Sequence, residues 1–288
     1  MNSPLIPDSA SWHGLLDAEY ALQQGQTCLT RSYARAPFKL QRPFYPEGPE
    51  VCHSVILHTA GGVVGGDRLS LQITLQPQTR ALITTAAASK IYRSRLSGDQ
   101  PIPSRQMVHL QVGAGACLEW FPQETIVFNG ATFQQQVRVD LSETAVWMGW
   151  ELTRLGRSAR GEQFLTGNWR SSTEVWRGNR PLWVDPQWIP GDETILHSPH
   201  GLKGCPVVGS WAIVGTTLSP DLVEQARSLW QGTGETGVTT LLEGMLCRYR
   251  GHSTTEARKW FIAVWDLVRS SVLGHSACLP RVWPITKF

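Results

Sequence analysis

Short apolar segments that alternate with polar residues, separated by Gly, Pro, Asn and Asp, run from residue 12 to about residue 216. Apolar and polar residues that alternate with a period of two indicate β-strands, because successive side chains point to opposite faces of a sheet. No window with a helical period interrupts this stretch. We expect strands at Leu15–Ala21, Thr27–Ala34, Val51–Leu57, Leu69–Leu75, Ala81–Ala86, Gln106–Val112, Ala116–Trp120, Phe133–Val139, Ala145–Leu152, Glu162–Trp169, Thr173–Arg177 and Val207–Thr217.

The C-terminal part of the chain carries two helix signals. Ser219 followed by Pro220 is an N-cap with a first-turn proline, and apolar residues then recur at helical spacing up to Trp230. After a β-like stretch at Thr239–Tyr249, Ser253-Thr-Thr-Glu256 forms a capping box before a long apolar face that ends at Gly274. The sequence therefore predicts two amphipathic helices near the C-terminus.

Composition supports one folded unit without a nucleic-acid function. Hydrophobic residues make up 41% of the 288 residues, which excludes a disordered chain, and no Gly/Ser-rich or charged linker divides it. We expect a single domain over 1–288, with a β body at about 12–217 and a helix-containing tail at about 218–288. The net charge of +3 is small and scattered, so it does not predict a nucleic-acid partner.

Targeting signals and cysteine spacing suggest an intracellular protein. The first twelve residues lack the basic start and apolar run of a signal peptide, and no stretch approaches the ~18 apolar residues of a membrane span. We therefore expect a cytoplasmic location and no membrane contact. The six cysteines are dispersed without a C-x-x-C pair, which predicts free thiols.

Searches for catalytic and nucleotide-binding motifs fail. The glycine run Gly61–Gly66 lacks the Lys and Ser/Thr of a phosphate loop, and no G-x-S-x-G elbow or dinucleotide fingerprint occurs. The sequence favours a protein that is not an enzyme.

Histidine and cysteine occur close together at Cys52, His53 and His58. In one strand His53 and His58 point to opposite faces, and Cys52 lies roughly 20 Å from His58, so they cannot share an ion. We interpret them as ordinary strand residues, and His197 and His200 as residues of a surface loop.

Six ordered segments resemble the UreD (UreH) family of urease accessory proteins. They include the glycine-rich stretch Ile56–Asp67, in which Thr59-Ala60 replaces the Pro-Pro expected there, and the segment Leu118–Ile126. The others are Arg42–Gly48, Thr84–Ser94, Trp150-Glu151 with Leu155-Gly156-Arg157, and Pro280–Trp283. The resemblance covers nearly the whole chain.

The resemblance implies a mainly β fold, in which stacked β-sheets form a right-handed helical arrangement with two helices. It also implies a non-enzymatic scaffold that binds apo-urease together with the accessory proteins UreF and UreG. Such a scaffold assists delivery of Ni²⁺ to urease through an internal passage, with Ni²⁺ bound transiently and no tightly bound cofactor.

Weak oxygen ligands suit such a passage, because the ion must leave as readily as it enters. Polar residues of the matching motifs are candidates to line it, although Thr84 and Thr85 point opposite ways in a strand, so only part of the set can face one lumen. The candidates are Asp67, Thr84, Thr85, Ser89, Glu119, Glu124, Glu151 and Glu174. Arg93, Arg154 and Arg157 are expected to pair with carboxylates or to contact a partner.

Two alternatives stay open at this point: a β-rich enzyme with a site in its cavity, and an interaction module unrelated to urease. A catalytic function would require a convergent nucleophile and base or a three-ligand metal site.

Overall fold

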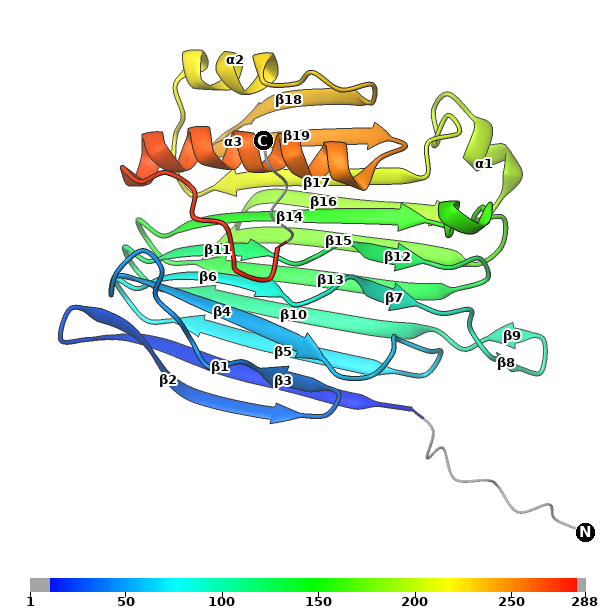
Figure 1. Cartoon of the computed structure of the whole chain (residues 1–288), viewed down its shortest axis with the longest axis horizontal. Helices are drawn as coiled ribbons and strands as arrows, with labels where there is room; N and C mark the ends of the chain where they lie inside the picture. Colours follow the sequence, from blue (N-terminus) through cyan, green and yellow to red (C-terminus); the bar gives the residue numbers. More distant parts are fainter. Residues whose placement is uncertain (1–10, 284–288) are drawn as a thin grey trace, which may run out of the picture.

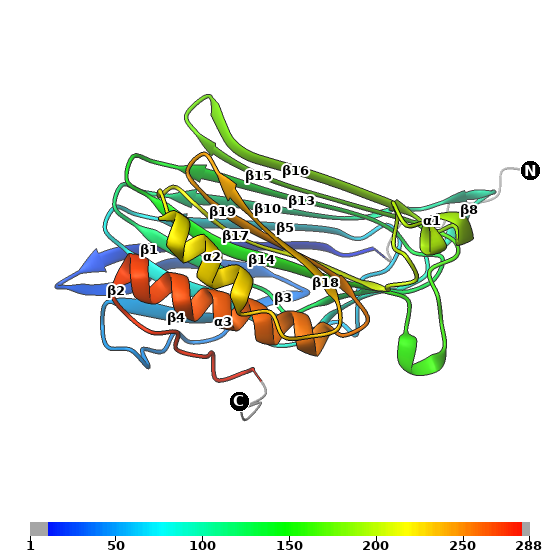
Figure 2. The ribbon, with the colours of Figure 1, turned by 90° about the horizontal axis from the view of Figure 1, so that it is seen from above.

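The computed structural model describes residues 11–283, which form two large β-sheets and a layer of helices (Figure 1). The domain prediction for 1–288 also includes residues 1–10 and 284–288, which lie outside the described residues. Figure 2 shows helices α2 (Pro220–Ser228) and α3 (Thr254–Leu273) on one side of the ten-stranded sheet, with the seven-stranded sheet on the other.

The seven-stranded sheet lies on the side away from the helices. In spatial order its strands are β16 (Arg180–Pro190), β15 (Asn168–Arg177), β13 (Thr132–Leu141), β10 (Ser104–Val112), β5 (Arg68–Leu75), β1 (His13–Gln23) and β2 (Gln26–Arg35). The five strands from β15 to β1 are mutually parallel, and only the edge strands β16 and β2 pair antiparallel.

The ten-stranded sheet is the middle layer (Figure 2). Its main path follows β18 (Glu235–Leu241), β19 (Gly244–Gly251), β17 (Val207–Val214), β14 (Val146–Leu155), β11 (Cys117–Phe121), β6 (Arg80–Thr85), β4 (Val51–His58) and β3 (Phe38–Leu40). Beside this path lie β7 (Ser89–Ile91) and β12 (Thr125–Val127). A separate hairpin is formed by β8 (Leu96–Ser97) and β9 (Gln100–Pro101).

Successive long strands alternate between the two sheets. The chain passes from β4 in one sheet to β5 in the other, then to β6, β10, β11, β13, β14 and β15 in alternation. Each strand therefore lies parallel to the strand that entered the same sheet one turn earlier. This topology agrees with the expected mainly β fold of stacked sheets, whereas the right-handed helical arrangement stays a prediction.

Two apolar cores follow from this layering. One lies between the sheets and contains residues such as Leu110, Ile83 and Leu118. The other lies between the ten-stranded sheet and the helices and contains residues such as Trp211 and Phe261. Strands of the middle sheet are buried on both faces, so β11 is apolar almost throughout, with Glu119 as the exception.

Most tryptophans lie in these cores. Eight of the 13 are buried, and only Trp12 and Trp188 are largely exposed. The tryptophan content therefore reflects a large interior rather than a large exposed apolar surface.

The two C-terminal helices are confirmed with their caps. The Ser219 hydroxyl accepts from the Leu222 amide, the Ser253 hydroxyl accepts from the Glu256 amide, and Gly274 ends α3 with a φ of 74°. A third, short helix, α1 (Glu193–His197), was not predicted; it is capped by Asp192 and is only five residues long. A 3₁₀ turn occupies Ser158–Arg160.

The strand predictions next to β15 and β16 require correction. Residues 162–167 form a loop rather than the first part of a strand, and the strand begins at Asn168. The strand β16 was not predicted; it contains Pro181, Pro186 and Pro190, and an edge strand tolerates proline on its unpaired side. The β character predicted for Thr239–Tyr249 is confirmed: these residues belong to the hairpin of β18 and β19, which extends the middle sheet.

Other predictions from the sequence can be checked directly. All six cysteines are free. Within residues 11–283, no helix combines the length and the apolar character needed to cross a membrane.

Candidate functional site

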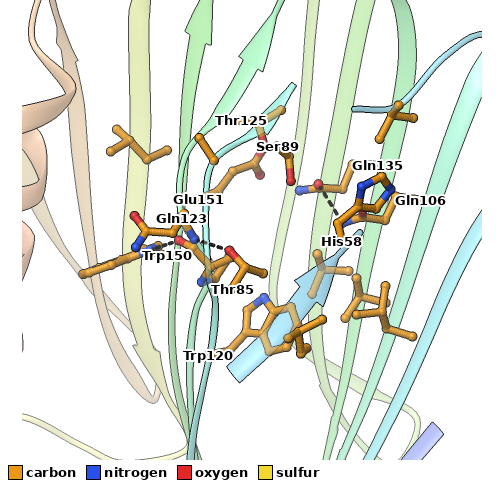
Figure 3. Close-up of a pocket in the computed structure, with 18 of the residues that line it drawn as sticks. His58, Thr85, Ser89, Gln106, Trp120, Gln123, Thr125, Gln135, Trp150 and Glu151 are labelled. Carbon is orange, nitrogen blue, oxygen red and sulfur yellow. Dashed lines mark hydrogen bonds between the residues drawn. The ribbon is translucent and has the colours of Figure 1, made fainter. Parts of the chain in front are cut away.

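A cavity of about 470 Å³ lies between the two sheets. Its walls combine apolar side chains such as Trp120 and Trp147 with hydroxyl, amide and carboxyl groups. The polar lining residues are His58, Thr85, Ser89, Lys90, Gln106, Gln123, Thr125, Gln135, Glu151, Thr173, Asp185 and Ser210. Figure 3 shows side chains from both sheets converging on this space.

Three of the eight candidate residues line the cavity: Thr85, Ser89 and Glu151. Thr85 is the last residue of β6 and Ser89 is the first residue of β7. The turn between these strands therefore positions both side chains at the cavity. The Thr85 hydroxyl accepts a hydrogen bond from the Gln123 amide at 2.8 Å, which holds its oxygen at the cavity wall.

Glu151 is the acidic candidate at the cavity. Its Oε2 accepts from the Ser171 hydroxyl at 2.7 Å, and its Oε1 accepts from Thr153 at 3.4 Å. Burial raises the pKa of Glu151 to about 7, and the nearby Asp185 carboxylate adds to this rise. Asp185 itself pairs with Arg248 at 2.5 Å. Glu151 therefore exchanges its proton near neutral pH, whereas an ordinary glutamate is fully ionised there.

The strand alternation decides where the other candidates point. Thr84 faces the helix side, where its hydroxyl donates to the Phe121 carbonyl at 2.6 Å and accepts from Trp283 Nε1 at 3.0 Å. Thr84 and Thr85 thus lie on opposite faces, as the sequence predicts. Glu119 also faces the helices and accepts from Trp265 Nε1 at 2.6 Å and from Arg269 Nε at 2.9 Å.

Glu124 and Glu174 are held by ion pairs outside the cavity. Glu124 pairs with Arg258 of α3. Glu174 accepts from Trp176 at 3.1 Å and lies 3.5 Å from Arg138 on the adjacent strand. Neither residue is part of the cavity lining.

Asp67 is fully buried in the turn that follows the glycine run. Its Oδ1 accepts from the Trp12 amide at 2.8 Å and its Oδ2 from the Val64 amide at 2.9 Å. The glycines permit this turn: Gly66 has a φ of +98°, and a Cβ on Gly65 would lie 2.5 Å from the Ile102 carbonyl. The sharp turn is as predicted, but the carboxylate is bonded to backbone amides and does not line the cavity.

His58 lines the cavity, although the sequence predicts an ordinary strand residue at this position. Its Nδ1 donates to the Ala60 carbonyl at 3.2 Å, so in the neutral ring Nε2 carries the lone pair. Nε2 is buried and has no hydrogen-bond partner in residues 11–283. Burial lowers the pKa of His58, which keeps the imidazole neutral and able to bind a cation at pH 7. The alternation of side chains along the strand predicts that His53 and His58 lie on opposite faces of the sheet. The sequence does not show which of these faces borders a cavity.

The remaining histidines and arginines are placed largely as expected. His197 and His200 are exposed, but His197 is the last residue of α1 rather than part of a loop, and His200 lies in the turn that follows. Arg157 pairs with Glu162, whereas Arg154 donates to the Ser158 hydroxyl at 2.6 Å and to the His252 carbonyl at 3.1 Å. The prediction of a carboxylate partner is thus confirmed for Arg157.

Fold and site together define a class: a two-sheet β protein with parallel central strands and an internal cavity rich in hydroxyl and amide oxygens. Comparison with known sequences supplies the family. A family model described as UreD urease accessory protein matches residues 13–284. The chain belongs to the UreD family of urease accessory proteins.

The similarity to individual relatives extends over nearly their full length. The chain is 59% identical over 274 residues to the urease accessory protein UreD of Nostoc punctiforme, covering 95% of this chain and 96% of the relative. It is 56% identical to the protein of that name from Acaryochloris marina, covering 96% and 97%. The corresponding protein of Synechocystis is 39% identical, with 93% and 99% covered.

Proposed function

We propose that this protein is a non-enzymatic urease maturation factor that acts in the cytoplasm, binding apo-urease together with UreF and UreG. In this role it assists delivery of Ni²⁺, and the cavity between the sheets serves as part of the route. Family membership supports the role in urease maturation. The main observation in support of this nickel route is the oxygen-rich cavity, with Glu151 and His58 in its wall.

The lining chemistry suits transfer rather than storage of a divalent ion. Hydroxyl and amide oxygens of Thr85, Ser89 and Gln123 are neutral ligands that leave much of an ion's hydration shell in place. Glu151 supplies negative charge only when ionised, and its pKa of about 7 lets a proton compete with the ion. The His58 Nε2 lone pair adds a nitrogen ligand, which Ni²⁺ accepts readily.

The enzymatic alternative has little support in the cavity. Of the groups that line it, the His58 ring is bonded to a backbone carbonyl and the Thr85 hydroxyl donates to the Ala87 carbonyl. Neither pair is a nucleophile activated by a base. A scaffold with a passage accounts for the cavity without requiring turnover.

The decisive experiment replaces Glu151 by Gln, because the amide keeps the shape of the carboxyl and can still accept from Ser171. Complexes with apo-urease, UreF and UreG are purified, and nickel per urease active site is counted by mass spectrometry. We expect a normal yield of complex and a several-fold lower nickel content. Glu174→Gln is the matched control, since Glu174 lies outside the cavity, and it is expected to retain full nickel.

Two results would contradict the proposal. Full nickel in a fully assembled Glu151→Gln complex would exclude a role of Glu151 in the route. Loss of the complex itself would make Glu151 a structural residue.

A further inference from the structure

A second group of potential metal ligands lies on the opposite face of the middle sheet from the cavity. One ligand atom each from Glu47, His53 and Cys278 lies within 4.8 Å of the others, and no other such group of three occurs in residues 11–283. Glu47 precedes β4, His53 lies in β4, and Cys278 lies in the segment after α3. The group therefore joins the first part of the chain to its C-terminal segment.

The charges around this group are unbalanced. Arg269 of α3 is buried, and its guanidinium bonds Glu47 at 2.6 and 3.0 Å and Glu119 at 2.9 Å. One guanidinium therefore donates hydrogen bonds to two carboxylates. If Glu119 and Cys278 are both ionised, the negative charges exceed the positive charge by the charge of one divalent cation.

Glu47 keeps room for a cation. An ionised carboxylate offers about four lone-pair sites, and the structure fills three of them, with His53 Nε2 and the two Arg269 nitrogens. The two bonds from the Arg269 guanidinium favour the ionised form of Glu47, so the carboxylate can offer its remaining lone pair to an ion.

His53 supplies an independent sign of an unfilled site. Its side chain is 1% exposed, Nε2 lies 2.6 Å from Glu47 Oε1, and Nδ1 has no hydrogen-bond partner in the described part of the chain. Buried ring nitrogens are normally bonded. Because Nε2 donates to the Glu47 carboxylate, the neutral ring carries its lone pair on Nδ1, and this unpartnered lone pair is free to bind an ion.

We infer that Glu47, His53 and Cys278 bind a zinc ion, with water as the fourth ligand, and that this ion fastens the C-terminal segment to the middle sheet. Carboxylate oxygen, imidazole nitrogen and thiolate sulfur are the donors that tetrahedral zinc takes, at about 2.0–2.3 Å. Binding releases the Cys278 thiol proton to solvent, which the half-buried position of Cys278 permits. Because the thiol must lose its proton to bind, binding of the ion strengthens with rising pH.

This site can be measured separately from the cavity, because no cysteine lines the cavity. A cobalt ion in the zinc site gives a thiolate-to-cobalt absorption band, whereas an ion among the oxygens and the imidazole of the cavity gives none. The readout therefore does not depend on the proposed nickel route.

The experiment titrates Co²⁺ into the full-length chain, fused to a cysteine-free solubility partner and freed of metal by chelation. We expect a thiolate band that saturates at one equivalent and disappears when one equivalent of Zn²⁺ is added. Cys278→Ser removes the band, and this variant should fold because the side chain is only half buried. Cys205→Ser is the matched control: Cys205 lies 3.7 Å from His252, so it is also a cysteine beside a histidine, and its loss should leave the band unchanged.

Absence of the band from the unsubstituted chain would overturn the inference, as would a band that persists in Cys278→Ser. Displacement of Co²⁺ by Ni²⁺ but not by Zn²⁺ would overturn the assignment to zinc. As a second measurement, Zn²⁺ should raise Tm in the unsubstituted chain and not in Cys278→Ser, because an ion that binds only the folded state stabilises it.

Discussion

Glu151 couples folding to pH through its position at the cavity wall. In the unfolded chain a glutamate titrates near 4.5, whereas burial raises the pKa of folded Glu151 to about 7. Between these values the unfolded chain is ionised and the folded protein is protonated. The stability of the fold therefore falls as pH rises from about 4.5 to about 7, because ionisation favours the unfolded chain.

We predict that Glu151→Gln removes this pH dependence. At pH 5 the two proteins should differ little, and at pH 8 the variant should be more stable by up to about 3 kcal/mol, since each pKa unit corresponds to about 1.4 kcal/mol. Urea denaturation at both pH values measures the difference. An equal difference at pH 5 and pH 8 would show that Glu151 does not titrate in this range, and Glu174→Gln should behave like the unsubstituted protein.

The contacts of Asp67 indicate a structural role, because both carboxylate oxygens accept hydrogen bonds from backbone amides. Asp67→Ala leaves these two amides without their acceptors, which should cost about 1–3 kcal/mol of unfolding free energy. Complex yield and nickel content should then fall in proportion. The exposed Asp99 is the control, with Asp99→Ala expected near neutral. A stable Asp67→Ala protein that assembles fully but lacks nickel would instead favour a role in the passage.

At the scale of elements, α3 is fixed to the middle sheet by both apolar and ionic contacts. Phe261 and Trp265 enter the second core, while Arg269 reaches Glu119 on β11 and Glu47 before β4. Burial raises the pKa of Glu119, although Arg269 opposes this rise. The helix thus depends on a buried guanidinium that compensates two carboxylates.

We predict that Arg269→Ala destabilises the protein by about 3–5 kcal/mol, because it leaves buried carboxylates without their partner. Arg258→Ala on the same helix removes a more exposed pair with Glu124 and should cost about 1 kcal/mol or less. Thermal or urea denaturation of both variants provides the comparison. Equal costs would show that the Arg269 contacts do not anchor α3.

At the scale of the whole molecule, the alternation of strands between two sheets creates a long interior in which a cavity can form. The helices cover only the ten-stranded sheet, and the outer face of the other sheet carries polar side chains such as Gln72, His109 and Arg138. The molecule therefore has a covered face, an uncovered face and a polar space between the sheets.

For this arrangement we predict no turnover of urea, esters, phosphates or nucleotides by the purified protein. The cavity offers weak ligands but no activated nucleophile in its described lining. Standard hydrolysis assays at pH 6, 7 and 8 test this expectation. Activity that copurifies with the chain and disappears on a single substitution would contradict the scaffold proposal.

The sequence by itself determined those strands and helices that are marked by patterns within a few neighbouring residues. The periodicity of two identified most of the long strands, such as β5 and β10, and the capping box at Ser253 identified the start of α3. These signals are readable because side-chain alternation and capping involve residues within a few positions of one another. The ordered motifs also identified the family.

Only the tertiary structure decided which side of each strand borders the cavity and which borders the helices. Thr84 and Thr85 are adjacent and chemically alike, yet one contacts Trp283 and the other lines the cavity. Glu47, His53 and Cys278 likewise meet only after folding, across more than 200 positions of sequence. Both outcomes depend on how sheets and helices stack, and stacking is set by contacts between segments far apart in the chain, which local sequence patterns do not encode.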